Sequence, residues 1–547
     1  MSSALPVDPA STGKSNRRPV HSRKYSLRHL LGQTNRFLNF AEVVTSRGLI
    51  TDRNGRRVLG LARKLADYPE MHVLSITDNP GGNPMLSADT LGTDLLARGQ
   101  EVVIHLSCKD WNRNALQSFG WKLASEGFEN ILALSGDFPT AGYKGRADGV
   151  FDTDSIGLLN MFSKMNSGLV VGKGKRAQVQ TQTNFFMAAV VNNHKRYENE
   201  VMPQYFKLAK KIEHGAGLII SQIGYDTRKQ DELLKYMHLH GMRVPVLANV
   251  YVLSLPAARF FHKGKIPGVE VTDALLDLCE QHAASPDKGK AFFLELAAKQ
   301  WAIAKGLGYR GAYIGGHLKF EDYVKVIDLA NAYSEDDWRS FSKEFHFHQE
   351  DEFYYFEANP ETGLNSTTVN QEYQRSKSPD SLKKLRRNAP LAYKVNRMVH
   401  NAVFEKGTAG FRGGKKLYQA IERSGKTVGK AMHSGEQVAK IIGFDCKDCG
   451  DCSLPDIAYL CPESQCVKNE RNGPCGGTRQ GLCEVGDKEC IWSRAYDRLK
   501  AYGEEEAMLD RPVVYKNGAL KGTSAWANTF LERDHHAVEN QESKESS

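Results

Sequence analysis

The sequence lacks the long apolar runs that mark membrane and secreted proteins. No window approaches eighteen consecutive apolar residues, and the first 28 residues are rich in Ser, Pro, Lys and Arg without the apolar core of a signal peptide. A spanning helix and a standard secretory signal are therefore not expected. We predict a cytoplasmic protein without a membrane partner, beginning with a disordered basic segment over residues 1–35.

Cysteine is scarce outside one short segment. Of ten cysteines in 547 residues, only Cys108 and Cys279 lie outside the range 446–490. In a chain without a secretory signal, such a cluster predicts metal ligation rather than disulfides. The net charge of +9 is modest for this length, and aromatic residues are not interleaved with the basic ones, so we expect no nucleic-acid partner.

From about residue 36 to 335, apolar β-branched runs alternate with amphipathic stretches of helical length. Near-continuously apolar strands separated by helices predict a parallel sheet buried on both faces, and eight units indicate a (β/α)₈ TIM barrel. An open doubly wound sheet is the alternative fold, but no G-x-G-x-x-G motif directly follows a strand. The predicted strands are Phe37–Val44, His72–Thr77, Val102–Ser107, Ile131–Gly136, Phe185–Val191, Gly217–Gln222, Val244–Val252 and Gly311–Ile314.

The composition changes near residue 340, where His, Glu and aromatic residues become frequent. We place the barrel domain at 36–340 and a smaller cysteine-rich, metal-binding module, α+β or mostly α, at 341–533. A polar tail at 534–547 is predicted to be disordered.

The cysteine cluster holds eight thiols and no histidine, which predicts two four-thiolate sites. Three cysteines at successive x₂ spacing plus a distant fourth favour [4Fe–4S] binding, and zinc is the alternative. The predicted metal ligands are Cys446, Cys449, Cys452, Cys461, Cys466, Cys475, Cys483 and Cys490.

Polar residues stand at or near the carboxyl ends of several predicted strands, which is where TIM barrels carry their active sites. They are Glu42, Thr77, Asp78, His105, Asp137 and Gln222. A carboxyl group inside an apolar run is costly to bury, and the raised pKa that burial brings suits a general acid. A capped or salt-bridged glutamate at the barrel rim is the alternative interpretation of Glu42, and a hydrogen-bonded core histidine is the alternative interpretation of His105.

Two sets of segments resemble known proteins. EVVTSRG around Glu42, HLSCKD around His105, ALSGDFP around Asp137, VFDTDSIGLL from Val150 and KIEHGAGLIISQ ending at Gln222 resemble methylenetetrahydrofolate reductases. The segment CPESQCVKNERNGPCGGTRQGLCEVGDKECIW resembles the C-terminal module of some bacterial members of that family, and a small separate subunit found beside others.

The resemblance implies a flavin-dependent oxidoreductase acting on CH–NH groups, which interconverts 5,10-methylenetetrahydrofolate and 5-methyltetrahydrofolate by hydride transfer at flavin N5, as in methionine synthesis. It implies that Glu42 protonates folate N10, that Asp137 lies near both pterin and flavin, and that Gln222 binds the pterin. Departures from the family pattern at Ser135, Phe151 and Val190 leave FAD and FMN both open. The implied flavin contacts are Thr77, His105, Gly136, Asp137, Phe151, Asp154, His194 and Lys211.

The resemblance also implies the partners. They are a tetrahydrofolate, which can be polyglutamylated, and either NAD(P)H or an iron–sulfur, ferredoxin-type electron carrier; we expect a homo-oligomer. A basic run from Lys383 to Arg397 could bind an acidic carrier or a polyglutamate tail, although such runs are more often solvated helix faces. Two other functions stay open: a folate or corrinoid methyl-transfer protein with a thiolate metal site, and a zinc-binding protein built on an inactive barrel.

Overall fold

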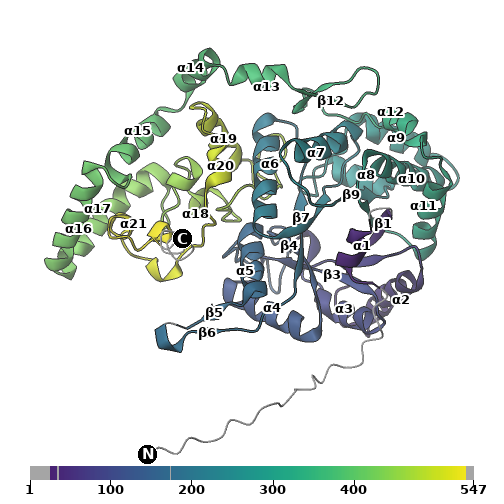
Figure 1. The fold of residues 1–547 in the computed structure, drawn as a ribbon, viewed down its shortest axis with the longest axis horizontal. Coiled ribbons are helices and arrows are strands. Elements are labelled where there is room, and N and C mark those ends of the chain that lie inside the picture. The colour runs from purple at the N-terminus through teal and green to yellow at the C-terminus, as the bar shows by residue number, and fades with distance from the viewer. Residues whose placement is uncertain (1–24, 34–35, 173, 538–547) are drawn as a thin grey trace, which may run out of the picture.

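The computed structural model describes residues 25–33, 36–172 and 174–537. Figure 1 shows two bodies side by side, a barrel of alternating strands and helices and a second body made mainly of short helices from the C-terminal part of the chain. Within the described residues, no helix has both the length and the apolar character needed to cross a bilayer.

Eight parallel strands close into a barrel in the order β1-β10-β9-β8-β7-β4-β3-β2. Every residue of β3 is buried, because the lumen covers one face of the sheet and the outer helices cover the other. Each observed strand overlaps its predicted run, and the predicted (β/α)₈ fold is confirmed. The strands are β1 Leu38–Val43, β2 Val73–Ile76, β3 Glu101–Ser107, β4 Asn130–Leu134, β7 Phe186–Val191, β8 Ala216–Ser221, β9 Val246–Tyr251 and β10 Gly311–Gly315.

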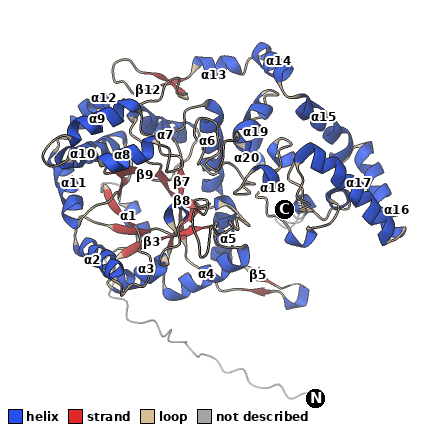
Figure 2. Cartoon of the chain, turned by 180° about the vertical axis from the view of Figure 1, so that it is seen from behind, coloured by secondary structure: helices blue, strands red, loops and turns tan. Residues whose placement is uncertain are grey.

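Helices surround the strands (Figure 2), and capping residues fix where they begin and end. The Asn112 side chain accepts a hydrogen bond from the N–H of Ala115 at the start of α4, and Gly127 ends that helix at φ +89°. The ring consists of α2 Arg53–Asp67, α3 Ala88–Ala97, α4 Arg113–Glu126, α5 Ser155–Ser167, α6 Glu198–Glu213, α7 Thr227–Leu239, α8 Leu255–His262, α9 Asp273–Ala283, α10 Lys290–Leu307, α11 Phe320–Ala332 and α12 Asp337–Glu344.

A short helix, α1 (Leu27–Gly32), belongs to the end of the barrel opposite the strands' carboxyl ends. Leu27 and Leu30 join the apolar cluster that fills the lumen, and the N–H of Leu27 donates to Glu101 Oε1 at 2.9 Å. The prediction of disorder over residues 1–35 is wrong for this part, because the two leucines bury completely against lumen side chains. Residues 1–24 and 34–35 lie outside the described residues.

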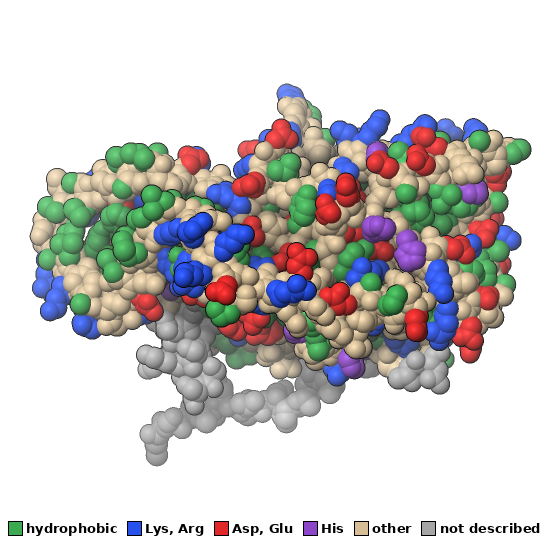
Figure 3. Space-filling model, turned by 90° about the horizontal axis from the view of Figure 1, so that it is seen from above, with side chains coloured by type: hydrophobic (Ala, Val, Ile, Leu, Met, Phe, Trp, Pro, Cys, Tyr) green, Lys and Arg blue, Asp and Glu red, His purple; other side chains and the backbone are tan. Residues whose placement is uncertain are grey.

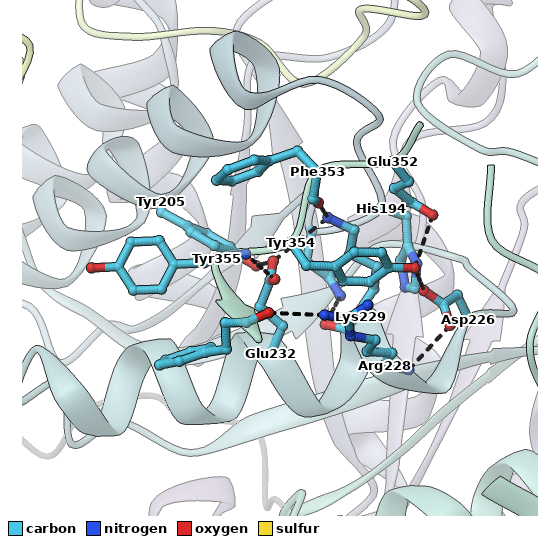
Figure 4. A network of polar contacts seen from close by, with 12 residues as sticks. His194, Tyr205, Asp226, Arg228, Lys229, Glu232, Glu352, Phe353, Tyr354 and Tyr355 are labelled. Atoms are coloured by element: carbon cyan, nitrogen blue, oxygen red, sulfur yellow. Dashed lines mark hydrogen bonds and ion pairs between the residues drawn. The ribbon is translucent and has the colours of Figure 1, made fainter. Parts of the chain in front are cut away.

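The aromatic segment after residue 345 belongs with the barrel rather than with the second body. Figure 4 shows this segment against α7, where Tyr354 donates to Asp226 Oδ2 at 2.7 Å and the N–H of Tyr355 donates to Glu232 Oε2 at 2.5 Å. The change of composition near 340 therefore does not mark the end of the barrel's contacts. The segment continues into the hairpin β11 Phe356–Ala358 and β12 Asn365–Val369.

The second body is helical, with irregular cysteine-bearing loops between its helices (Figure 1). The prediction that residues 534–547 form a disordered tail is wrong for 534–537, since His535 is buried between two aspartates; residues 538–547 lie outside the described residues. The helices of the second body are α13 Gln371–Ser376, α14 Pro379–Asn388, α15 Leu391–Val399, α16 Ala409–Arg423, α17 Lys426–Phe444, α18 Pro462–Gln465, α19 Ile491–Lys500, α20 Ala507–Asp510 and α21 Ala525–Phe530.

Candidate active site

Glu42 lies near the carboxyl end of β1, half-buried at the mouth of the barrel. Gly315 at the end of β10 leaves room for it, because a Cβ there would lie 2.9 Å from Glu42 Oε2. No described residue donates a hydrogen bond to this carboxyl group. Burial, followed by the negative charge of Asp137, raises the pKa of Glu42 from 4.5 to about 7. The group can therefore hold a proton near neutral pH.

Asp137 follows β4 in a loop whose shape depends on glycine. Gly136 has φ +90°, and a Cβ there would meet the Cβ of Ser107 at 2.9 Å. Asp137 Oδ2 accepts a hydrogen bond from the N–H of Gly81 at 2.7 Å, which ties the loop after β4 to the loop after β2. The sequence-predicted pair Glu42 and Asp137 is thus brought close enough for one charge to shift the pKa of the other.

Two of the predicted flavin contacts carry buried polar atoms for which the described part of the chain offers no hydrogen-bond partner. These atoms are Thr77 Oγ1, directly after β2, and His194 Nε2, in the loop after β7. Burial lowers the pKa of His194 to about 3, so its ring is neutral. Buried polar atoms are nearly always hydrogen-bonded, and unpartnered ones therefore fit a site that a polar ligand completes.

His105 lies deeper than the mouth. Its Nε2 atom is 2.8 Å from Ser75 Oγ and 3.2 Å from the hydroxyl oxygen of Tyr313, so the three side chains form a polar contact across the lumen. Burial lowers the pKa of His105 to about 3. Gln222 directly follows β8 and is half-buried, and its Oε1 accepts from the N–H of Ile223 at 2.9 Å.

The structure places Asp154 and Lys211 where the barrel meets the second body. Asp154 caps α5 through the N–H groups of Ile156 and Gly157, and its other oxygen accepts from the N–H of Asn472 at 2.9 Å. Lys211 donates to the carbonyl of Val190, and burial lowers its pKa to about 7.

Phe151, another predicted flavin contact, is buried at the strained φ of +38°. Its ring stacks on Phe138, with centroids 6.3 Å apart.

A groove leads outward from Glu42 between α2 and α11. Its lining combines apolar side chains such as Leu61 and Phe293 with many basic ones. Sequence reasoning missed this groove, because its basic residues are spread over α2, the start of α10 and the loops before α10 and α11, and form no run. The basic residues are Arg56, Arg57, Lys64, Lys288, Lys290 and Lys319.

The eight clustered cysteines divide into two sets of four, as predicted, and each set lines one cavity. The outer set lies beside α17, and the inner set lies next to the barrel. Backbone N–H groups face the sulfurs: Asp448 donates to Cys446 Sγ and Gly477 to Cys475 Sγ, both at 3.4 Å. Four thiols with such donors fit a metal-thiolate centre. The outer set is Cys446, Cys449, Cys452 and Cys461, and the inner set is Cys466, Cys475, Cys483 and Cys490.

The inner set is joined to the barrel by buried charged side chains that sequence reasoning did not predict. Lys207 on α6 pairs with Glu470 at 2.7 Å, with both side chains about 1% exposed. Lys468, which lines the inner cavity and pairs with Glu484, also donates to the carbonyl of Gly136 at 2.8 Å. The inner cysteine set therefore lies one side chain away from the loop that carries Asp137.

Comparisons with known proteins give two family matches. Residues 51–305 match the family described as methylenetetrahydrofolate reductase, and residues 426–518 match the domain described as methylene-tetrahydrofolate reductase C terminal. No curated protein matches the chain.

Two solved structures are similar in part. One is an uncharacterized protein from Clostridium thermocellum described as binding two copies of 5-methyl-5,6,7,8-tetrahydrofolic acid, with 10% identity, a TM-score of 0.39, and coverage of 56% of this chain and 97% of that one. The other, from Toxoplasma gondii ME49, is described as a deoxyribose-phosphate aldolase, with 11% identity, a TM-score of 0.28, and coverage of 56% and 95%. With TM-scores this low, neither bears on the function of this chain.

Proposed function

We propose that this chain, which belongs to the methylenetetrahydrofolate reductase family, interconverts 5,10-methylenetetrahydrofolate and 5-methyltetrahydrofolate with a flavin held at the barrel mouth. The family is one of folate oxidoreductases. The observation that carries the proposal for this chain is Glu42, a carboxyl group without a described hydrogen-bond donor, whose pKa is raised to about 7 and which lines the groove between α2 and α11.

In this proposal Glu42 is the general acid. At neutral pH a substantial fraction of the carboxyl group is protonated, and it can pass that proton to N10 of the folate so that the five-membered ring opens. Asp137 acts on Glu42 through its charge, since it raises the pKa that makes the proton available. Its own position is held by the N–H of Gly81.

The polar side chains at the barrel mouth are suited to hydrogen-bond a flavin. Thr77 Oγ1 and His194 Nε2 are buried polar atoms that a ligand could complete, and the bare Cα of Gly136 keeps the loop close to β3. When bound, the flavin supplies the hydride chemistry at N5. The departures at Ser135, Phe151 and Val190 keep FAD and FMN both as candidates.

We assign iron–sulfur centres rather than zinc to the two cysteine sets. In tetrahedral zinc sites with Zn–S bonds of about 2.3 Å, the sulfurs lie about 3.8 Å apart. The only group of three or more His, Cys, Asp or Glu in the described chain whose ligand atoms all lie within 4.8 Å of one another contains no cysteine. The wider spacing of the sulfurs supports a larger centre such as [4Fe–4S], which would supply one-electron transfer.

The position of the inner set supports an electron route through the second body. The inner set adjoins Gly136 through Lys468, whereas the outer set lies beside α17. An acidic, ferredoxin-type carrier is the partner that this route implies. Figure 3 shows Lys and Arg side chains gathered beside exposed hydrophobic ones over the C-terminal helices. The basic run lies on two helices of the second body, α14 and α15.

The first test is an anaerobic absorbance spectrum with iron, sulfide and zinc analysis of freshly purified protein. We expect flavin bands together with about eight irons per chain, the content of two [4Fe–4S] centres. Flavin with zinc alone would keep the reductase and overturn the iron–sulfur assignment. Protein that holds no flavin after gentle purification, and takes up none when it is added, would overturn the proposal and favour the methyl-transfer alternative.

The electron route has its own test, with one cysteine replaced in each set. We expect Cys475→Ser and Cys449→Ser both to block flavin reduction by a reduced ferredoxin, while dithionite still reduces the flavin directly. Flavin reduction by NAD(P)H at the same rate in both variants and the unmodified protein would show that the second body is not the entry point.

A further inference from the structure

A group of metal-ligand side chains lies apart from both the barrel mouth and the two cysteine sets. Asp456, in a short turn between Cys452 and Cys461, meets His535 and His536 from the last described turn of the chain. Their ligand atoms all lie within 4.8 Å of one another. Asp456 precedes the two adjacent histidines by 79 and 80 positions in the sequence, so the fold brings the carboxylate and the imidazoles together.

The spacing of these atoms fits a single small ion. Asp456 Oδ2 lies 3.0 Å from His535 Nε2, and Asp456 Oδ1 lies 3.6 Å from His536 Nε2. Nitrogen and oxygen ligands at about 2.0–2.1 Å from a tetrahedral zinc are about 3.3–3.4 Å apart. The two observed distances, one to each oxygen of the Asp456 carboxylate, lie on either side of that value.

The surroundings of His535 match those of a metal-bound histidine. Its Nδ1 atom contacts Asp451 Oδ1 at 2.5 Å, and this leaves Nε2 directed at Asp456. Metal-ligating histidines usually donate their second ring N–H to a carboxylate in this way, which fixes the ring orientation and the tautomer. Asp451 is itself held, because it also accepts from the N–H of Asn517 at 2.7 Å and of His535 at 3.1 Å.

The group has access to solvent on one side. His536 and Asp534 line a cavity together with His400 and Trp526. The side chain of His536 is 30% exposed, whereas those of His535 and Asp456 are nearly buried. Three protein ligands with a fourth position facing a cavity is the arrangement of an open metal site rather than a closed structural one.

We propose that Asp456, His535 and His536 bind a divalent transition metal ion, with Asp451 orienting His535. Zinc suits two imidazoles and one carboxylate, and an iron(II) ion is chemically compatible with the same set. Asp451 stands between Cys449 and Cys452, so the ion would also brace the loop of the outer cysteine set against the C-terminal residues.

The simplest competing arrangement has no metal. A protonated His535 between Asp451 and Asp456 would form two ion pairs; although burial opposes it, the two carboxylates raise the pKa of His535 to about 10. That arrangement gives His536 no part, although its ring lies over His535 with centroids 3.9 Å apart and faces the same carboxylate. The role of His536 therefore separates the two arrangements.

The test uses the full chain, purified anaerobically with its cysteine sites loaded, and zinc alone as the probe. We expect one equivalent of Zn²⁺ to bind, and zinc X-ray absorption to show nitrogen and oxygen at about 2.0–2.1 Å with imidazole scattering and no sulfur at about 2.3 Å. His536→Gln should weaken zinc binding at least about tenfold, because loss even of an outer partner costs 10–100-fold. The control His348→Gln, at an exposed histidine elsewhere, should change nothing.

Several results would overturn the proposal. They are zinc bound through sulfur only, no zinc bound at all, or a His536→Gln variant that binds zinc like the unmodified protein. The iron content of the variant shows whether the second body is intact. If His536→Gln fails to fold, the X-ray absorption spectrum of the unmodified protein decides alone.

Discussion

The barrel mouth and the junction between the two bodies both bury polar side chains, but they treat them differently. At the mouth, Thr77 Oγ1 has no hydrogen-bond partner among the described residues, and Glu42 has no described donor. At the junction, Lys207 and Glu470 form an ion pair with both side chains almost completely buried, and Asp154 accepts three backbone N–H groups. The unpaired polar groups at the mouth fit a site that a ligand completes. The paired groups at the junction hold the two bodies in one arrangement.

The contrast assigns different roles to residues that the sequence treats alike. Glu42 is half-buried and Glu470 is buried, and both carboxyl groups have a raised pKa, in each case mainly because of desolvation. Only Glu470 has a cation within 3 Å. A raised pKa alone therefore does not identify the catalytic acid, and the partners decide.

The largest expected effect is on catalysis at the mouth. Glu42→Gln keeps the size of the side chain but removes the proton, and general acids typically contribute about 10²–10⁴-fold to the rate. We expect folate turnover to fall by that factor in steady-state assays, while the bound flavin is still reduced by its electron donor in stopped-flow measurements.

The control for this substitution is Glu70→Gln, at an exposed glutamate near the opposite end of the barrel. It should leave turnover unchanged. Unchanged folate turnover by Glu42→Gln would contradict the assignment of Glu42 as the general acid. Its role would then be structural, like that of the paired groups at the junction.

The next effect concerns stability at the junction. Lys207→Met leaves Glu470 buried without its cation, and breaking a buried pair on one side costs about 3–5 kcal/mol. The double variant Lys207→Met/Glu470→Leu should recover most of this loss, since apolar replacement of a whole buried pair is often neutral. Denaturant unfolding of the full chain measures both.

A surface pair supplies the matched control. Lys64 and Glu321 are 3.9 Å apart with more than 60% of each side chain exposed, so Lys64→Met should cost less than about 1 kcal/mol. An equal loss at both positions would mean that burial does not distinguish the junction pair.

The barrel was predictable from sequence to a greater extent than the way its parts are joined. Each strand is marked in the sequence by a local apolar run. Because the carboxyl ends of the strands meet at one mouth of the barrel, the positions of Glu42, Thr77 and Asp137 near those ends predict that they lie there together. Cysteine spacing likewise predicted two sets of four. The junction was not predictable, because Lys207 and Glu470 are 263 residues apart and each reads alone as an ordinary surface charge.

The two mispredicted ends have a common physical cause. The segments 1–35 and 534–547 as a whole are polar enough in composition to suggest disorder. Two leucines in the first segment close the lumen, and one histidine in the second lies between two aspartates. A few specific contacts order parts of these segments despite their polar average composition. A prediction based on the composition of a sequence window does not detect such contacts.

A smaller effect concerns pH. The pKa of Glu42 is raised, so the acid is protonated below about pH 7 and loses its proton as pH rises through that value. Reduction of the methylene substrate should therefore fall about tenfold per pH unit above 7. Asp137→Asn removes the nearby negative charge and should shift the falling limb of the kcat/KM profile to lower pH. The same profile in both proteins would contradict the electrostatic link.

The smallest effect distinguishes the groove from the basic run. If the folate binds at Glu42 and its polyglutamate tail runs along the groove, the tail passes Arg57. Lys383 lies elsewhere, on α14 in the second body. Exposed ion pairs contribute about 0.2–1 kcal/mol, so Arg57→Gln should raise the KM of a triglutamyl folate by no more than about fivefold and leave the monoglutamyl KM nearly unchanged. Lys383→Gln should alter neither value. If Lys383→Gln, and not Arg57→Gln, weakened the triglutamyl substrate, the tail would bind on α14, and the charges of the groove would be solvated surface like those of any helix.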